Sequence, residues 1–189
     1  MRKVPPHLDN PIESTILDFG DWILPFLKQT NHTPNILTTY SFILGLLSLY
    51  YLYKRNIYIF AILYFFSFVF DCLDGHMARV YKMFSEFGDF YDHFTDFVVG
   101  FGLIIILFKN YRKIISINII LFYLVMLFLM NLHVACQQSY FKDNHTYSES
   151  LDIYNKLSVN PDHIKYTRFF GPGTFYIFTI ILIFYLQTK

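Results

Sequence analysis

The sequence predicts an all-α integral membrane protein: a bundle of five or six transmembrane helices with an N-terminal amphipathic interfacial helix. Its residues are 54% hydrophobic and only 15% charged, whereas charged residues make up about a quarter of an ordinary soluble domain. Long uncharged runs recur along the chain and approach the roughly 20 residues that a membrane-spanning helix needs. Because no internal repeat or low-complexity segment divides the chain, we expect one membrane domain over residues 1–189.

Residues 11–29 precede the first span and mix apolar side chains with acidic ones. This pattern predicts an amphipathic helix that either lies on the membrane surface or packs on the protein itself. The preceding segment, Met1–Asn10, contains prolines and an aspartate and does not resemble a signal peptide. We therefore expect the protein to enter the membrane through its own spans.

The uncharged runs place the transmembrane helices in order. The first ends at the basic pair Lys54-Arg55, the second becomes polar in its last turns, and the third begins with acidic residues. The polar segment 139–167 is expected outside the membrane as a loop or a short amphipathic helix. The predicted spans are residues 36–53, 57–79, 86–108, 113–135 and 169–187.

The charge pattern limits the function and the topology. A net charge of +1 with scattered basic residues argues against nucleic acid as a partner, because nucleic-acid sites concentrate Lys and Arg. Cys72 and Cys136 form no Cys-x-x-Cys pair, which argues against a structural zinc site. With alternating spans, nine Lys and Arg residues lie on the N-terminal side and six on the other. This bias places the N-terminus on the cytoplasmic side.

Aspartates gather where the second predicted span ends and the third begins. Charged groups at membrane depth are costly and generally face an interior or a watery cavity. On a helix, Asp71, Asp74, Gly75 and Ala78 are spaced i, i+3, i+4 and i+7, so they share one face. This arrangement puts two carboxylates beside two residues that are too small to block a ligand.

The next helix repeats the arrangement with Gly88, Asp92 and Asp96 at i, i+4 and i+8. If the two faces converge, their carboxylates suit Mg²⁺ or Mn²⁺, and magnesium often shares its coordination shell with substrate phosphates. A pyrophosphate is therefore the expected substrate group. Arg79 offers a planar set of donors for its oxygens.

These residues resemble a complete family signature. The spacing matches all eight fixed positions of the CDP-alcohol phosphatidyltransferase (class I CDP-alcohol phosphotransferase) motif, read here as Asp71-x2-Asp74-Gly75-x2-Ala78-Arg79-x8-Gly88-x3-Asp92-x3-Asp96. The segment from Thr33 to Thr38 also resembles the family's usual entry into its first transmembrane helix. The resemblance implies an enzyme of phospholipid biosynthesis. Such an enzyme transfers a phosphatidyl or phosphoaminoalcohol group from a CDP-linked donor to a hydroxyl acceptor and releases CMP.

The resemblance also implies roles for individual residues. One or two divalent metal ions, Mg²⁺ or Mn²⁺, would be held at the cytoplasmic membrane face by Asp71, Asp74, Asp92 and Asp96. Asp96 would in addition be the catalytic base toward the acceptor hydroxyl. The CDP site would be lined by Gly75, Ala78 and Arg79, with Asn35 and Thr38 near the nucleotide. The implied partners are a CDP-alcohol or CDP-diacylglycerol donor, a lipid or small alcohol acceptor, the lipid bilayer and, as a family expectation, a second copy of the chain.

Several alternatives stay open at the level of sequence. Family members usually have six core spans and five are evident here, so segment 139–167 holds a re-entrant element or one helix is absent. Asp92-His93 leans toward the branch that uses CDP-choline or CDP-ethanolamine, whereas the short chain resembles the CDP-diacylglycerol branch. An intramembrane prenyltransferase would also use aspartates with a metal-bound pyrophosphate, but on separate motifs. A cation transporter would place its acids nearer the middle of the bilayer.

Overall fold

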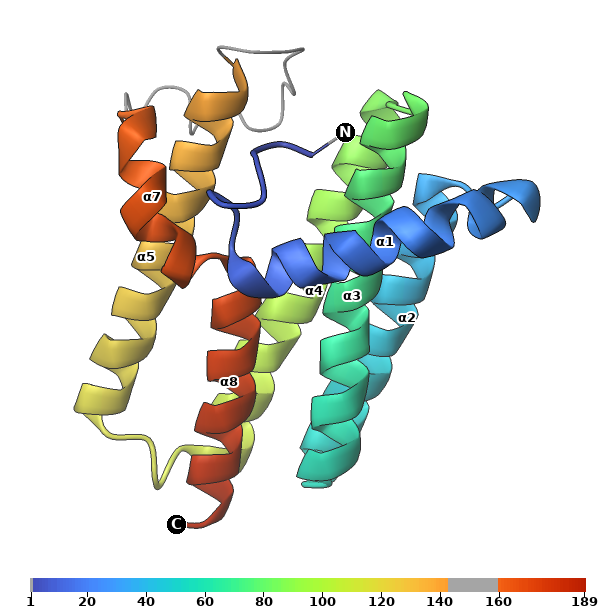
Figure 1. The fold of residues 1–189 in the computed structure, drawn as a ribbon. Coiled ribbons are helices and arrows are strands. Elements are labelled where there is room, and N and C mark those ends of the chain that lie inside the picture. The colour runs from blue at the N-terminus through green and yellow to red at the C-terminus, as the bar shows by residue number, and fades with distance from the viewer. Residues whose placement is uncertain (1, 143–159) are drawn as a thin grey trace.

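The computed structural model describes residues 2–142 and 160–189, which form helices and the turns between them. Five helical stretches are long and apolar enough to cross a membrane, which confirms the predicted class of fold. These stretches run side by side, and the N-terminal helix, residues 11–29, lies across them (Figure 1). In chain order the elements are α1 (Pro11–Gln29), α2 (Pro34–Tyr53), α3 (Ile57–Tyr81), α4 (Glu86–Tyr111), α5 (Ile117–Lys142), the 3-10 helix η2 (Pro161–His163), α7 (Ile164–Thr167), the 3-10 helix η3 (Arg168–Phe170) and α8 (Pro172–Gln187).

The amphipathic helix α1 packs one face against the protein and exposes the other. Asn10 caps it, because its side chain accepts hydrogen bonds from the amides of Ile12 and Glu13. One face packs on α3, and the backbone of α1 comes close to the Leu73 side chain at Gly20, where an added Cβ would lie 2.8 Å from it. The other face exposes aromatic rings, including Trp22 with 74% of its surface accessible. The helix thus packs on the protein and also leaves an aromatic surface for the membrane interface.

Small residues on α2 let it contact α3 and α4 at close range. The hydroxyls of Ser41 and Ser67 each donate to the other residue's carbonyl at 2.9 Å, which joins α2 to α3. Gly45 lies against α4, since a Cβ there would be 2.7 Å from Val99. Small side chains allow such approach between membrane helices. In this way α2 fixes the positions of α3 and α4 relative to each other.

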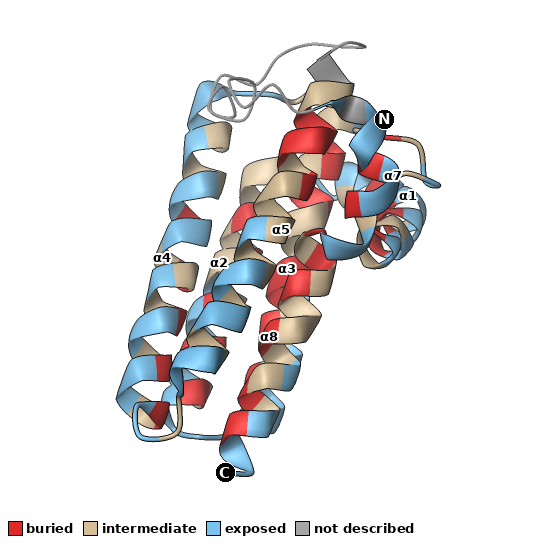
Figure 2. Cartoon of the chain, turned by 90° about the vertical axis from the view of Figure 1, so that its left-hand side faces the viewer, coloured by how far each residue is buried: buried red, intermediate tan, exposed pale blue. Residues whose placement is uncertain are grey.

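The remaining helices pack around this group. α8 contacts α3 through Tyr176, whose ring stacks on Tyr64 and Phe68 with centroid distances of 4.7 and 4.4 Å. α5 contacts α7 and α8. Large parts of α4 and α5 are exposed in Figure 2, as expected for helices that face lipid.

The helix boundaries differ from the predicted ones mainly in the second half of the chain. α5 begins at Ile117 and continues to Lys142, so the first residues of the segment predicted as a loop or a short amphipathic helix continue this span as helix. Residues 160–170 form short helices before α8 begins at Pro172. The remainder of the predicted polar segment, residues 143–159, lies outside the described residues. The five candidate spans all belong to the described part of the chain, and a sixth span remains a family expectation.

Candidate active site

A tight link between α3 and α4 brings the acidic ends of these helices together. α3 stops at Lys82, whose φ of 54° is left-handed, and the amide of Met83 closes the turn by donating to the carbonyl of Ala78 at 2.9 Å. Ser85 then caps α4 by accepting a hydrogen bond from the Gly88 amide. The last turns of α3 therefore lie beside the first turns of α4.

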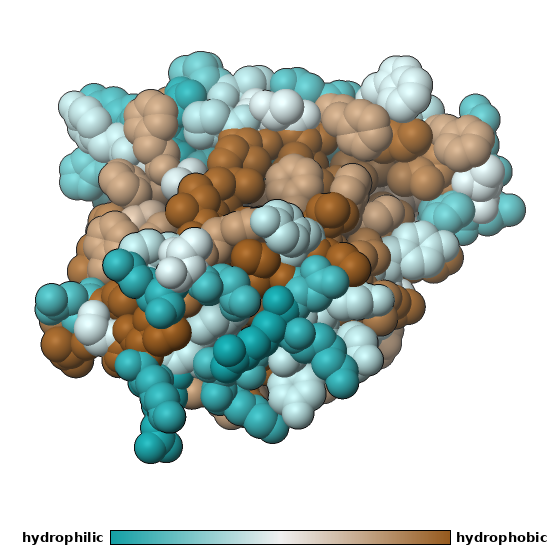
Figure 3. Space-filling model, turned by 90° about the horizontal axis from the view of Figure 1, so that it is seen from below, coloured by the Kyte–Doolittle hydropathy of each residue, from teal (hydrophilic) through white to brown (hydrophobic). Residues whose placement is uncertain are grey.

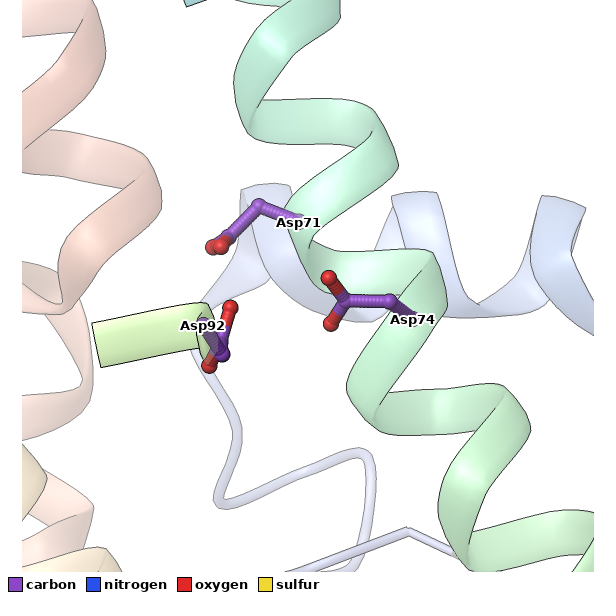
Figure 4. Close-up of side chains that lie close together, drawn as sticks. All are labelled: Asp71, Asp74 and Asp92. Carbon is purple, nitrogen blue, oxygen red and sulfur yellow. The ribbon is translucent and has the colours of Figure 1, made fainter. Parts of the chain in front are cut away.

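Three carboxylates converge across this junction. Asp71 and Asp74 extend from α3 and Asp92 from α4, as Figure 4 shows, and one oxygen from each lies within 4.8 Å of the others. The Oδ1 atom of Asp92 is buried and accepts no hydrogen bond from the residues that the structure describes. Unpartnered buried carboxylate oxygens are costly unless a cation satisfies them. Oxygen ligands in this number and at this spacing fit a hard divalent cation such as Mg²⁺ or Mn²⁺.

α2 supplies a support for one of these carboxylates. The hydroxyl of Thr38 donates to Oδ2 of Asp74 at 2.6 Å, and both side chains are almost fully buried, with 3% and 4% exposure. A hydrogen bond to an ionised carboxylate is short and strong. Thr38, which the family resemblance assigned to the nucleotide, thus holds Asp74 in this structure.

The glycines of the motif leave room for polar side chains. The guanidinium of Arg79 lies along α3 over Gly75, where a Cβ would be 3.1 Å from its terminal nitrogen. Its Nε is buried and has no hydrogen-bond partner. On α4, a Cβ at Gly88 would lie 2.8 Å from the amide oxygen of Asn35. Both glycines therefore permit close approach of groups that the sequence assigned to the CDP site.

The other predicted residues lie further along the same helices. Asp96 is one turn beyond Asp92 on α4, is exposed, and is not among the three carboxylates that meet within 4.8 Å. Ala78 is partly buried one turn beyond Asp74. The ring of His93 lies 3.8 Å from the Asp92 carboxylate, with its Nδ1 atom 3.0 Å from the carbonyl oxygen of Asp89. The structure thus brings three of the four predicted metal ligands within 4.8 Å of one another, and Asp96 follows one turn later on the same helix.

Sequence reasoning missed an N-terminal contribution to the site. Lys3 interacts electrostatically with Asp71 and Asp92, although the sequence of Met1–Asn10 indicated only that this segment does not resemble a signal peptide. Glu13, at the start of α1, accepts a hydrogen bond from the amide of Gly173 at the start of α8. Burial raises the pKa of Glu13 to about 7, and the hydrogen bond opposes this effect.

A separate cavity of about 480 Å³ lies at the opposite end of the bundle, between the link from α2 to α3 and the end of α8. Its lining includes Lys54, Arg55 and Gln187. Seen from this end, the molecule carries a group of hydrophilic side chains beside broad hydrophobic areas (Figure 3). Because the converging carboxylates lie near the other end of α3, this cavity is not part of the candidate active site.

Comparison with known proteins agrees with the geometry. The sequence model of the CDP-alcohol phosphatidyltransferase family matches residues 31–187, which cover α2 through α8 and include every residue of the acidic motif. No curated protein and no solved structure gives a match. The matched region covers most of the chain and contains the converging carboxylates, so the protein belongs to the CDP-alcohol phosphatidyltransferase family.

Proposed function

We propose that this protein transfers a phospho-alcohol group from a CDP-linked donor to the hydroxyl of an acceptor, with release of CMP. The observation that carries the proposal is the convergence of three carboxylates from two helices at one point. Membership of the family supports transfer from a CDP-alcohol in phospholipid synthesis. The two substrate branches, aminoalcohol and CDP-diacylglycerol, remain alternatives for the assay below.

The donor's diphosphate would bind next to the carboxylates. Asp71, Asp74 and Asp92 would hold one or two divalent ions, with Thr38 orienting Asp74. When bound, Mg²⁺ or Mn²⁺ supplies positive charge that stabilises the phosphate oxygens and the departing CMP. Arg79 has an unpartnered Nε and lies over Gly75, so its guanidinium is available to phosphate oxygens. These groups position and neutralise the diphosphate before the reaction.

The acceptor would react on the open side of α4. Its hydroxyl oxygen forms a bond to the phosphorus of the transferred group, the bond from that phosphorus to the CMP oxygen breaks, and CMP leaves with the bonding electrons. Asp96 would take the hydroxyl proton as general base. Its exposure and its place one turn beyond Asp92 support this role, because an acceptor can reach it beside the bound donor. A productive hydroxyl would lie roughly 3 to 3.5 Å from the phosphorus.

The direct test is CMP release by purified protein with Mg²⁺ or Mn²⁺ and a panel of CDP donors and acceptors. CDP-choline and CDP-ethanolamine would be offered with diacylglycerol, and CDP-diacylglycerol with glycerol phosphate, inositol or serine. We expect release with at least one pair and its loss in Asp92→Asn. Glu86→Gln is the matched control, since Glu86 is an exposed acid of α4 outside the carboxylate group. Pyrophosphate release from a prenyl donor, or cation flux into vesicles without CMP formation, would instead support the prenyltransferase or the transporter.

We further propose that the active site opens to the cytoplasm. The distribution of nine Lys and Arg residues on the N-terminal side against six on the other supports this orientation. The carboxylates lie toward the end of α3 that is linked to α4, on the same side as the N-terminus (Figure 1). Protease accessibility of an N-terminal tag in sealed vesicles tests the orientation, and a lumenal tag would contradict it.

A further inference from the structure

The N-terminal segment, residues 2–10, is fixed at both ends beside the active site. At one end, Arg2 donates to Asp18 at 2.6 Å and to Asp21 at 3.1 Å, both on the polar face of α1. At the other end, Asp9 is buried and accepts hydrogen bonds from Gln137 of α5 and from the amide of Asn10. Figure 1 shows this segment crossing from α1 toward α5 and α7.

Lys3 is held between two anchored neighbours. Arg2 is tied to α1, and Val4 is buried at 3% exposure in a small core with Cys136 of α5 and Ile164 of α7. The contacts of these two neighbours therefore restrain the backbone at Lys3 and limit where its side chain can lie. It interacts electrostatically with Asp92, Glu13 and Asp71, and with Arg79. The segment thus adds a second cation to the region where Arg79 lies.

Within residues 2–142 and 160–189, the ammonium of Lys3 has no direct partner of opposite charge. None of the ion pairs formed by the described residues involves it. Burial lowers the pKa of Lys3, the charge of Arg79 acts in the same direction, and the nearby carboxylates oppose them. Lys3 is partly buried, and a cation that is shielded from water without a partner is costly. If Asp71 and Asp92 hold divalent ions, their charge is taken up by the metal, and a substrate anion can then offset the charge of Lys3 beside Glu13.

We propose that Lys3 is a further phosphate-binding residue of this active site, whose ammonium binds oxygens of a substrate phosphate together with Arg79. The proposal rests on the proposed function, because it takes the phosphate to belong to a substrate of the transfer reaction. The donor's diphosphate is the first source, since Arg79 and the metal-binding carboxylates surround the same region. The phosphate of an anionic acceptor offers the same chemistry.

The test compares Lys3→Met, Lys3→Arg and Lys165→Met in the full-length protein. Lys165 is an exposed lysine of α7 and serves as the matched control. Calorimetry with CDP and Mg²⁺ measures nucleotide binding without turnover, and CMP release gives the KM of the donor and of each acceptor. Because a hydrogen bond to a charged group is involved, we expect Lys3→Met to weaken CDP binding by about tenfold or more. Lys3→Arg should retain most of the affinity, and Lys165→Met should match the unchanged protein.

The outcomes separate the sources and the hypotheses. Weaker CDP binding by Lys3→Met places Lys3 on the donor. Unchanged CDP binding with a raised KM for glycerol phosphate, but not for diacylglycerol, places it on an anionic acceptor. Unchanged values in all of these measurements overturn the proposal, as does an equal loss in Lys165→Met. If Lys3→Met binds CDP weakly only because it unfolds, its melting temperature should be lowered, and Lys3→Arg should show the same lowering. That result would also count against a phosphate-binding role of Lys3. Unchanged protein that binds CDP but releases no CMP with any pair would refute the proposed function and leave the binding role of Lys3 standing.

Discussion

Replacing Thr38 by valine removes one hydroxyl and tests whether Asp74 is held ready for a metal ion. Valine has nearly the shape of threonine, so the change takes away the 2.6 Å hydrogen bond and little packing. Because both side chains are buried, water does not easily replace the lost donor. A hydrogen bond to a charged group contributes about 1.5 to 3 kcal/mol, and each 1.4 kcal/mol corresponds to a factor of about ten.

The ionised carboxylate of Asp74 is the form that binds a cation, so this loss falls on metal affinity. We expect Thr38→Val to weaken Mn²⁺ binding by about tenfold to a hundredfold, in the range typical of groups that orient metal ligands. Titration with Mn²⁺ followed by electron paramagnetic resonance measures the free and bound ion directly. The metal concentration for half-maximal CMP release should rise in parallel.

Thr39→Val is the matched control. The hydroxyl of Thr39 lies on the same helix but contacts Tyr91 and the carbonyl of Asn35 instead of a carboxylate. Its removal should change Mn²⁺ affinity by less than about threefold, because no metal ligand loses a partner. Equal affinity of Thr38→Val and the unchanged protein, or an equal loss in Thr39→Val, would refute this account of Asp74.

Three further predictions concern the bundle and α1. Gly45→Ala would place a Cβ 2.7 Å from a side chain of α4, and overpacking of this kind costs about 1 to 3 kcal/mol; its melting temperature should fall, whereas Gly100→Ala, whose Cβ meets nothing within 4 Å, should not. Burial raises the pKa of Glu13 from 4.5 to about 7. Between these pH values Glu13 keeps its proton in the folded state and has lost it in the unfolded state. The free energy of unfolding should therefore fall as pH rises from about 4.5 to 7, by at most about 3 kcal/mol. The melting temperature of Glu13→Gln should change less with pH across this range than that of the unchanged protein. An equal dependence on pH in both proteins would contradict the raised pKa of Glu13. Trp22 is the single tryptophan of the chain and lies on the exposed face of α1, so its fluorescence should be quenched by lipids brominated near the headgroup more than by lipids brominated at the chain end; the reverse order would argue against an interfacial helix.

The sequence was most informative where the chemistry is local. Asp71 and Asp74 share a helix face by spacing alone, and the short link to α4 left few ways to arrange Asp92, so the convergence could be predicted. The close packing of α4 on α2 could not be predicted, because it depends on how Gly45 and Val99 meet across the two helices.

The N-terminal contribution shows the limit more clearly. Asn10 and Pro11 signal the start of a helix, and this local feature was readable. Nothing near Lys3 in the sequence indicates that it would lie close enough to Asp92 to act on it electrostatically, because its place is set by the contact of Arg2 with Asp18 and by the packing of Val4 against Cys136 and Ile164. Long-range packing of this kind has no local pattern.

The N-terminal cap of α1 is hydrogen-bonded to the candidate span Ile164–Gln187, which is synthesised much later than α1. The side-chain amide of Asn10 donates to the carbonyl of Arg168 and to the hydroxyl of Thr174, which lie 158 and 164 positions later. At a translation rate of about 5 to 20 residues per second, these partners leave the ribosome roughly 8 to 30 seconds after Asn10. A nascent chain halted before Arg168 would leave the amide of Asn10 without these acceptors and Glu13 without its donor. Assembly of the start of α1 is thus a late event, which follows the synthesis of residues 168–174.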